Sequence, residues 1–389
     1  MQSKILYLAA WYPHRYDPMP GLFIKRYADL ISKAHKIAIL NIIPFEGLSI
    51  NYEIEQITEN DILVVRVYYR KLNAGVPLLG PSLRILRSLI AYKKGLNLLL
   101  KVFGLPQIVH VNVLTIRLGL IALFLKSRYK IPYVITEHSS NFLPEKKVSI
   151  NIFRKFLFQI ITKKSAGTSS VSVALKKGMN ALGINHKNFQ VIRNVIPNEF
   201  FNCKLTHSVS EQKIISNITC FDDAVKNISG LVRTIARLLE KRNDFLVYLV
   251  GDGPDKQKIE LLVQQLELNH IIKLTGLLEY DELVKAYQRS SFTVLFSNYE
   301  TMSVVIAESL SCGKPVIATN AGGMPELVTA ENGLLAEAGN ESDLLNKIDI
   351  MLDSFNKYDS NKLRDFAFRH FSEDVILNQF LSFYNKALS

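Results

Sequence analysis

Hydrophobic and polar residues along the chain form two kinds of segment that alternate. Short apolar runs of about four to eight residues are typical of buried strands, and most of the stretches between them have apolar residues at helical spacing. In the first half, the runs that predict strands are 5–10, 36–43, 62–67, 108–111, 133–136 and 191–192. Alternating strands and helices predict an α/β fold with a parallel, doubly wound sheet.

The same alternation begins again after residue 212, with apolar runs at 213–219, 245–250, 271–276, 292–296 and 315–319. We therefore predict a second doubly wound domain, and a chain of 389 residues is long enough for two such cores. Asn194 and Pro197 suit a linker. This places the first domain at 1–195, the second at 196–370 and a C-terminal helical segment at 371–389.

The composition is that of a globular protein, with 48% hydrophobic and 21% charged residues. The apolar run after Lys4 ends at Tyr12 and Pro13 without a cleavage site, so it predicts a buried strand and not a signal peptide. No apolar stretch reaches the roughly 18 residues of a membrane span. Three cysteines far apart in the sequence suit a reducing compartment, and we expect a cytoplasmic protein.

Charge is distributed unevenly between the two halves. Residues 1–200 have 28 Lys and Arg and 10 Asp and Glu, a net charge of +18, and the remainder has 19 and 25, a net charge of −6. A basic half suits nucleic acid, an anionic membrane surface or a phosphate-bearing acceptor. Because no nucleic-acid-binding motif accompanies it, we expect one of the latter two partners and no nucleic acid.

Two basic, apolar segments are candidates for contact with a membrane. The segment 81–103 mixes Leu, Ile and Phe with five basic residues, and 150–164 has a similar composition. Segment 81–103 could lie on anionic lipid, or it could be a core-facing helix with a solvated basic side. The first alternative predicts a peripheral protein on the inner face of the plasma membrane.

The stretch 298–328 contains the strongest candidate for chemistry. Glu300 and Glu308 flank an apolar run that is expected to be helical until Gly313 and Pro315 end it. Two glutamates at such a spacing are most often solvated, but here a strand precedes and another follows, and open α/β sheets bind ligands where a strand leads into a helix. Free N–H groups at the start of this helix would face an anion. They belong to Thr301, Met302 and Ser303.

This stretch, with its segments CGKPVIAT and GGMPE, resembles the E-x7-E signature of the retaining GT-B glycosyltransferases of family 4. The resemblance implies two Rossmann-like domains that face a central cleft, with the C-terminal helix returning to the first domain. It also implies retention of configuration, metal independence and front-face attack. By resemblance, Glu308 holds the ribose of a nucleotide diphosphate sugar, and Glu300 contacts the sugar ring or the region beside the phosphates.

Other donor-side residues come from the same resemblance. The glycine loop after the first strand, here with only Gly21, is expected to face the donor diphosphate and the acceptor. Lys226 corresponds to a lysine that contacts the phosphates. The arginine that usually precedes this lysine in the family is absent here, so its positive charge is either missing or supplied by another residue such as Arg26. The remaining positions border the nucleotide and its base. They are Gly251, Gly253 and Leu277.

Two histidines are candidates for the sugar side of the site. A lone histidine after a strand is usually structural, but the sequence TEH resembles the segment in which a family histidine lies against the reacting sugar. We assign this role to His138, and place His110 on the acceptor side as well. The predicted catalytic residues are therefore Glu300, Lys226 and His138.

The sequence thus predicts a retaining hexosyltransferase. It would transfer sugar from a UDP- or GDP-linked donor to a lipid-linked or saccharide acceptor at the membrane, in cell-surface polysaccharide biosynthesis. No Asp-x-Asp or other metal motif is present, and we expect no metal or cofactor. The missing arginine leaves an alternative open, a non-catalytic nucleotide-sugar-binding subunit that recruits partners to the membrane.

Overall fold

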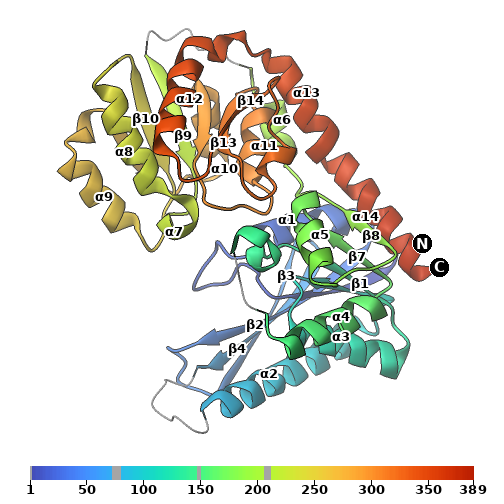
Figure 1. Cartoon of the computed structure of the whole chain (residues 1–389). Coiled ribbons are helices and arrows are strands. Elements are labelled where there is room, and N and C mark those ends of the chain that lie inside the picture. The colour runs from blue at the N-terminus through green and yellow to red at the C-terminus, as the bar shows by residue number, and fades with distance from the viewer. Residues whose placement is uncertain (1, 72–79, 147–149, 206–211) are drawn as a thin grey trace.

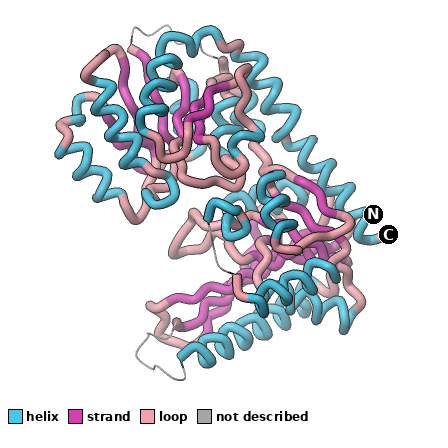
Figure 2. Tube along the Cα trace, viewed as in Figure 1, coloured by secondary structure: helices cyan, strands magenta, loops and turns pink. Residues whose placement is uncertain are grey.

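The computed structural model describes residues 2–71, 80–146, 150–205 and 212–389. They form two α/β domains, each built on its own sheet (Figure 1). Helices cover both sheets, and loops of both domains lie where the domains meet (Figure 2). The predicted fold class, α/β with two Rossmann-like domains, is confirmed.

The first sheet has the strand order β3-β4-β2-β1-β5-β6-β7-β8. All its neighbouring strands are parallel except β3, which is an antiparallel edge strand on β4. The six predicted runs overlap β1, β2, β4, β5, β6 and β8, whereas β3 and β7 were not predicted. The bounds are β1 Lys4–Ala9, β2 Lys36–Phe45, β3 Tyr52–Glu59, β4 Ile62–Arg70, β5 Ile108–Asn112, β6 Tyr133–Glu137, β7 Gly167–Ser170 and β8 Phe189–Val191.

Local capping sets where several helices of this domain begin. The side chains of Thr115, Asn151 and Ser172 each accept a hydrogen bond from the backbone N–H three residues later, as expected of N-cap residues. The helices are α1 Leu22–Ser32, α2 Gly80–Phe103, α3 Ile116–Tyr129, α4 Ile152–Lys164 and α5 Val173–Ala181, with short turns η1 Ser140–Phe142 and η2 Pro144–Lys146.

The second sheet is parallel, in the order β11-β10-β9-β12-β13-β14. Its strands are β9 Lys213–Ile218, β10 Phe245–Val250, β11 Ile272–Gly276, β12 Phe292–Leu295, β13 Val316–Thr319 and β14 Gly333–Ala336. Its helices and turns are α6 Asn198–Asn202, α7 Asp223–Lys226, α8 Ile228–Leu239, α9 Lys256–Gln265, η3 Leu268–His270, α10 Tyr280–Arg289, α11 Val304–Ser311, η4 Met324–Glu326, α12 Glu341–Ser354, η5 Phe355–Lys357 and α13 Ser360–Phe371.

The last helix, α14 (Glu373–Leu388), leaves the second domain and packs on the first (Figure 1). Its Tyr384 hydroxyl lies 3.1 Å from the hydroxyl of Tyr7 on β1 and 2.7 Å from Nδ1 of His110 on β5. Phe380 and Phe383 are buried in the same contact. The chain therefore crosses between the domains twice, once before β9 and once after α13.

Among the described residues, no helix is long and apolar enough to span a membrane. The three cysteines are free, but Cys203 and Cys312 are close in space although far apart in the sequence. Their sulfur atoms lie 3.2 and 3.7 Å from the same acceptor, the carbonyl oxygen of Phe200.

Candidate active site at the domain junction

Glu300 and Glu308 lie in different kinds of structure. Helix α11 begins at Val304, because the side chain of Ser303 accepts a hydrogen bond from the N–H of Ile306 and acts as the N-cap. Glu300 therefore lies in the loop after β12, and Glu308 lies inside the helix. The prediction that the two carboxylates flank one helix was wrong.

A pair of glycines fixes the loop of Glu300. A Cβ at Gly322 would lie 2.0 Å from the carbonyl oxygen of Glu300, and one at Gly323 would lie 2.1 Å from that of Thr301. The N–H of Gly323 donates to the Glu300 carbonyl at 2.9 Å. The segment GGMPE, which resembles part of the family signature, thus fixes the backbone of the loop that contains Glu300.

Lys226 and Glu300 form an ion pair. Asn298 brings their two segments together, since its N–H donates to the carbonyl of Val225 at 2.8 Å and its side chain to that of Ala224 at 3.0 Å. Nζ of Lys226 lies 2.5 Å from Oε2 of Glu300. Burial lowers the pKa of Lys226, but the carboxylate of Glu300 outweighs it and raises the pKa above its usual value. Lys226 therefore remains a cation.

Glu308 pairs with a residue of the other domain. Two nitrogens of the Arg26 guanidinium, on α1, each donate to Oε1 of Glu308 at 3.0 Å, and the hydroxyl of Tyr287 donates to Oε2 at 2.9 Å. The Glu308 side chain is only 5% exposed. Arg26 is thus bound to Glu308, and the structure shows no contact between it and the Lys226–Glu300 pair.

Further contacts join the domains beside this site. The carboxylate of Glu326 accepts hydrogen bonds from the N–H groups of Val173 and Ala174, at 2.9 and 2.6 Å, in the first turn of α5. A carboxylate is favourable at a helix N-terminus, where N–H groups lack partners. Glu145 of η2 accepts from the N–H of Gly322 at 3.2 Å. These contacts hold the loop of Glu300 against the first domain.

Gly21 is the N-cap residue of helix α1 and has a conformation that favours glycine. Its φ is 72°, and a Cβ there would lie 2.4 Å from the carbonyl oxygen of Trp11. The loop from β1 to α1 folds back on itself at this point.

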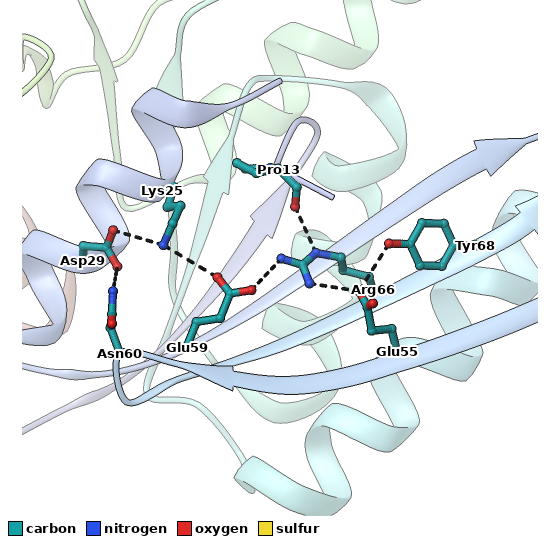
Figure 3. Close-up of polar contacts among 8 residues, drawn as sticks. All are labelled: Pro13, Lys25, Asp29, Glu55, Glu59, Asn60, Arg66 and Tyr68. Carbon is teal, nitrogen blue, oxygen red and sulfur yellow. Dashed lines mark hydrogen bonds and ion pairs between the residues drawn. The ribbon is translucent and has the colours of Figure 1, made fainter. Parts of the chain in front are cut away.

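Arg66, which sequence reasoning did not single out, secures this loop (Figure 3). Its Nε donates to the carbonyl of Pro13 at 3.0 Å, and its two terminal nitrogens donate to Glu55 at 2.9 Å and to Glu59 at 3.0 Å. Lys25 also lies near Glu59, at 3.6 Å, and its charge is compensated there. The only indication of this role in the sequence was a basic residue in a predicted strand that follows a segment with several glutamates.

His138 follows β6 and lies against α1. Its ring centroid is 4.4 Å from that of Phe23, two residues after Gly21. The ring is buried, which lowers the pKa of His138 to about 3 and keeps it neutral at physiological pH. Nε2 is buried without a hydrogen-bond partner. A buried polar atom without a partner is rare and suits a ligand-facing position.

His110 is part of the core. It lies in the middle of β5 and not at its end, and it is fully buried. Nδ1 is 2.7 Å from the hydroxyl of Tyr384, and Nε2 is 2.7 Å from that of Thr136. Because both ring nitrogens are bound inside the domain, the acceptor-side position expected for His110 does not agree with the structure.

The remaining predicted donor residues follow strands of the second sheet. Gly251 and Gly253 come after β10, where a Cβ would lie 1.8 Å from the carbonyl of Thr219 and 2.6 Å from the nitrogen of Phe221. Leu277 follows β11 and is 53% exposed. The carboxyl ends of parallel strands share one edge of a sheet, so these residues lie on the same edge as Lys226 and Glu300.

Within the described ranges, no group of three or more His, Cys, Asp or Glu side chains is arranged to hold a metal ion.

Comparisons with known proteins agree with this architecture. Residues 207–364 match the family model described as "Glycosyl transferases group 1". An uncharacterised glycosyltransferase of Methanocaldococcus jannaschii is 29% identical over 289 residues, 74% of either protein. The N-acetyl-alpha-D-glucosaminyl L-malate synthase of Bacillus anthracis is 25% identical over 58% of this chain and 61% of its own length.

Solved structures extend the similarity to the whole fold. Sucrose-phosphate synthase from Thermosynechococcus elongatus superposes with a TM-score of 0.77 at 17% identity, over 99% of both chains. Anabaena HepE in complex with UDP and glucose gives a TM-score of 0.73 at 16% identity, over 99% of this chain and 100% of that one. The chain therefore has a GT-B-like fold, and the part that matches the group 1 glycosyltransferase model lies within its second domain.

Proposed function

We propose that this protein is a retaining, metal-independent glycosyltransferase that transfers a hexose from a UDP- or GDP-linked donor to a lipid-linked acceptor at a membrane surface. The observation that carries the proposal is the Lys226–Glu300 pair, on a glycine-supported loop at the carboxyl edge of the second sheet. Anionic ligands of α/β sheets bind at this edge.

The proposed roles follow from the chemistry of each group. A glycosyl donor leaves behind a nucleoside diphosphate, and the charge that develops on its phosphate needs a fixed cation. Lys226 supplies that cation, and Glu300 orients its ammonium group and contacts the sugar. Glu308 accepts hydrogen bonds from the ribose hydroxyls. The neutral ring of His138, with its free Nε2, contacts the sugar from the first domain.

Helices α2, α3 and α4 support the membrane side of the proposal. None of the three contains an Asp or Glu, and together they contain twelve Lys and Arg. We call nine of their exposed large apolar residues the apolar face. It consists of Leu83, Ile85, Leu86 and Leu89 of α2, Leu120 and Phe124 of α3, and Ile152, Phe153 and Phe156 of α4.

An apolar surface surrounded by cations suits the interface of an anionic bilayer. The name of one similar protein points to the same kind of acceptor. A Campylobacter jejuni enzyme that is 29% identical over 46% of this chain and 49% of its own length is named as acting on a diphospho-undecaprenol-linked sugar. We place the protein on the cytoplasmic side of the membrane, where nucleotide sugars are available.

The proposal is tested by incubating the purified protein with a panel of UDP- and GDP-linked sugars and measuring release of the nucleoside diphosphate. We expect hydrolysis or transfer with at least one donor, and a loss of about 10²- to 10³-fold in the Glu300→Gln variant. Glu331→Gln, an exposed glutamate of the same domain, is the matched control. Thermal stabilisation by a nucleotide without turnover of any donor would contradict catalysis and would support a non-catalytic binding subunit.

A further inference from the structure

A pocket lies in the first domain, beside the residues assigned to the sugar. Its volume is about 570 Å³, within the usual range for small-molecule sites. Its walls come from the N-terminal halves of α2, α3 and α4, from η1 and from the loops that follow β1, β5 and β6. The pocket therefore opens at the carboxyl edge of the sheet, where α/β domains bind ligands.

Two contacts connect this pocket to His138. Ser139, the next residue in the chain, lines the pocket, and so does Trp11. The ring of Phe23 is near both Trp11 and His138, with centroid distances of 6.3 Å to the first and 4.4 Å to the second. A ligand in the pocket would thus end next to the group that faces the sugar.

The lining separates into an apolar wall and a cationic rim. Val113, Leu114 and Phe158 form buried parts of the wall, whereas Leu89 and Leu120 also belong to the apolar face. The pocket is therefore continuous with the surface proposed to contact the membrane.

Arg117 and Arg154 are the charged residues of the lining. Arg117 donates to the hydroxyl of Ser88 on α2 at 2.8 Å, which fixes its position. Both are in the first turns of their helices, where the helix dipole also favours an anion. Glu137, the buried acid nearest in sequence to Ser139, binds backbone N–H groups and does not pair with either arginine.

We propose that this pocket binds the first segment of the acceptor's hydrocarbon chain, with the phosphate of that lipid at Arg117 and Arg154. The inference rests on the proposed transfer to a lipid-linked acceptor and assigns the acceptor a site. An aliphatic chain fits the apolar wall, and two arginines complement a phosphate monoester or diester. The chain enters from the apolar face and the phosphate stops at the rim, which leaves the sugar-bearing end at His138.

Trp11 makes the test direct, because it is the only tryptophan of the chain and lines the pocket. Dodecyl phosphate, titrated below its micelle concentration, should shift the tryptophan emission to shorter wavelength in a saturable way. Inorganic phosphate alone should bind at least tenfold more weakly, and so should dodecanol. Equal responses to dodecanol and dodecyl phosphate would remove the phosphate site from the proposal.

Variants separate the pocket from the surface around it. Leu120→Glu places a carboxylate in the lining and should weaken dodecyl phosphate binding at least tenfold. Phe124→Glu, one helical turn later and similarly exposed (53% against 46%), lies outside the lining and should bind as the wild type does. Arg154→Gln should weaken binding of dodecyl phosphate but not of dodecanol, with Lys163→Gln on the same helix as its control.

Unchanged binding in both Leu120→Glu and Arg154→Gln, or equal losses in Leu120→Glu and Phe124→Glu, would overturn the proposal. Circular dichroism and thermal unfolding of each variant identify any loss that comes from misfolding. Hydrolysis of the donor is measured without an acceptor, so failure of the pocket proposal and failure of the proposed transferase activity give different results.

Discussion

At the scale of single residues, burial gives neighbouring side chains opposite pH responses. Burial raises the pKa of Glu137 to about 7, although N–H groups of Leu114, His138 and Ser139 bond to its carboxylate and lower it. Burial lowers the pKa of His138 to about 3, and that of His110 likewise. The stability that Glu137 contributes is present below pH 4.5 and lost as the pH rises to 7, whereas that of the histidines is present above pH 6.5 and lost as the pH falls.

The first prediction isolates Glu137 from the histidines. Glu137→Gln removes one titration, so the difference in unfolding free energy between wild type and variant should depend on pH. Relative to the variant, the wild type should lose up to about 3 kcal/mol between pH 4.5 and pH 8. Urea unfolding midpoints at a series of pH values measure this difference. A difference that is constant with pH would mean that the carboxyl has an ordinary pKa.

At the scale of elements, the sequence predicted most strands because apolar runs reveal buried strands directly. It missed β3 because Tyr52–Glu59 contains no apolar run and, as an edge strand, buries none of its residues fully. Asn60 and Asp61, which lie between β3 and β4, both have positive φ. An Asn-Asp pair at this position was the accompanying sequence signal of a hairpin. The start of α11 was misplaced because the apolar run alone did not show that Ser303 would act as its cap.

The second prediction concerns the glycine that supports the Glu300 loop. Gly322→Ala introduces a Cβ 2.0 Å from the Glu300 carbonyl at a φ of 56°, whereas Gly339→Ala, at a φ of 74°, meets nothing within 4 Å. Both variants should lose about 1 kcal/mol because of the positive φ. Only Gly322→Ala should also reduce donor turnover, by more than about tenfold, because the Glu300 loop must move. Equal turnover in the two variants would contradict this role of Gly322.

At the scale of the whole molecule, few of the contacts between the two domains could be predicted from the sequence. Arg26 and Glu308 are 282 positions apart, and the contact of Glu326 with α5 spans about half that separation. The resemblance to a glycosyltransferase family supplied candidate residues at the carboxyl edges of both sheets. It did not show that Glu308 has a cation as its partner, since that depends on the packing of two separately folded cores.

The third prediction tests the apolar face. Wild-type protein should sediment with vesicles that contain anionic phospholipid, and less so with neutral vesicles or at high salt, because the helices of the apolar face contain lysines and arginines and no acidic residue. Replacing Phe153 and Phe156 together by Glu should weaken this binding at least tenfold. Leu261→Glu, at a leucine of α9 that is 50% exposed, is the control in the second domain. Binding that resists the double substitution would place the membrane contact elsewhere.

The ion pair between Arg26 and Glu308 affects how the two domains can separate. Moving the domains apart would separate the almost completely buried carboxylate of Glu308 from its counter-ion, Arg26, and a buried carboxylate without a counter-ion is unfavourable. A ligand whose hydroxyl groups donate to Glu308 competes directly with the guanidinium. Binding of such a ligand would therefore break the ion pair that joins the two domains, and its dissociation would let the ion pair form again.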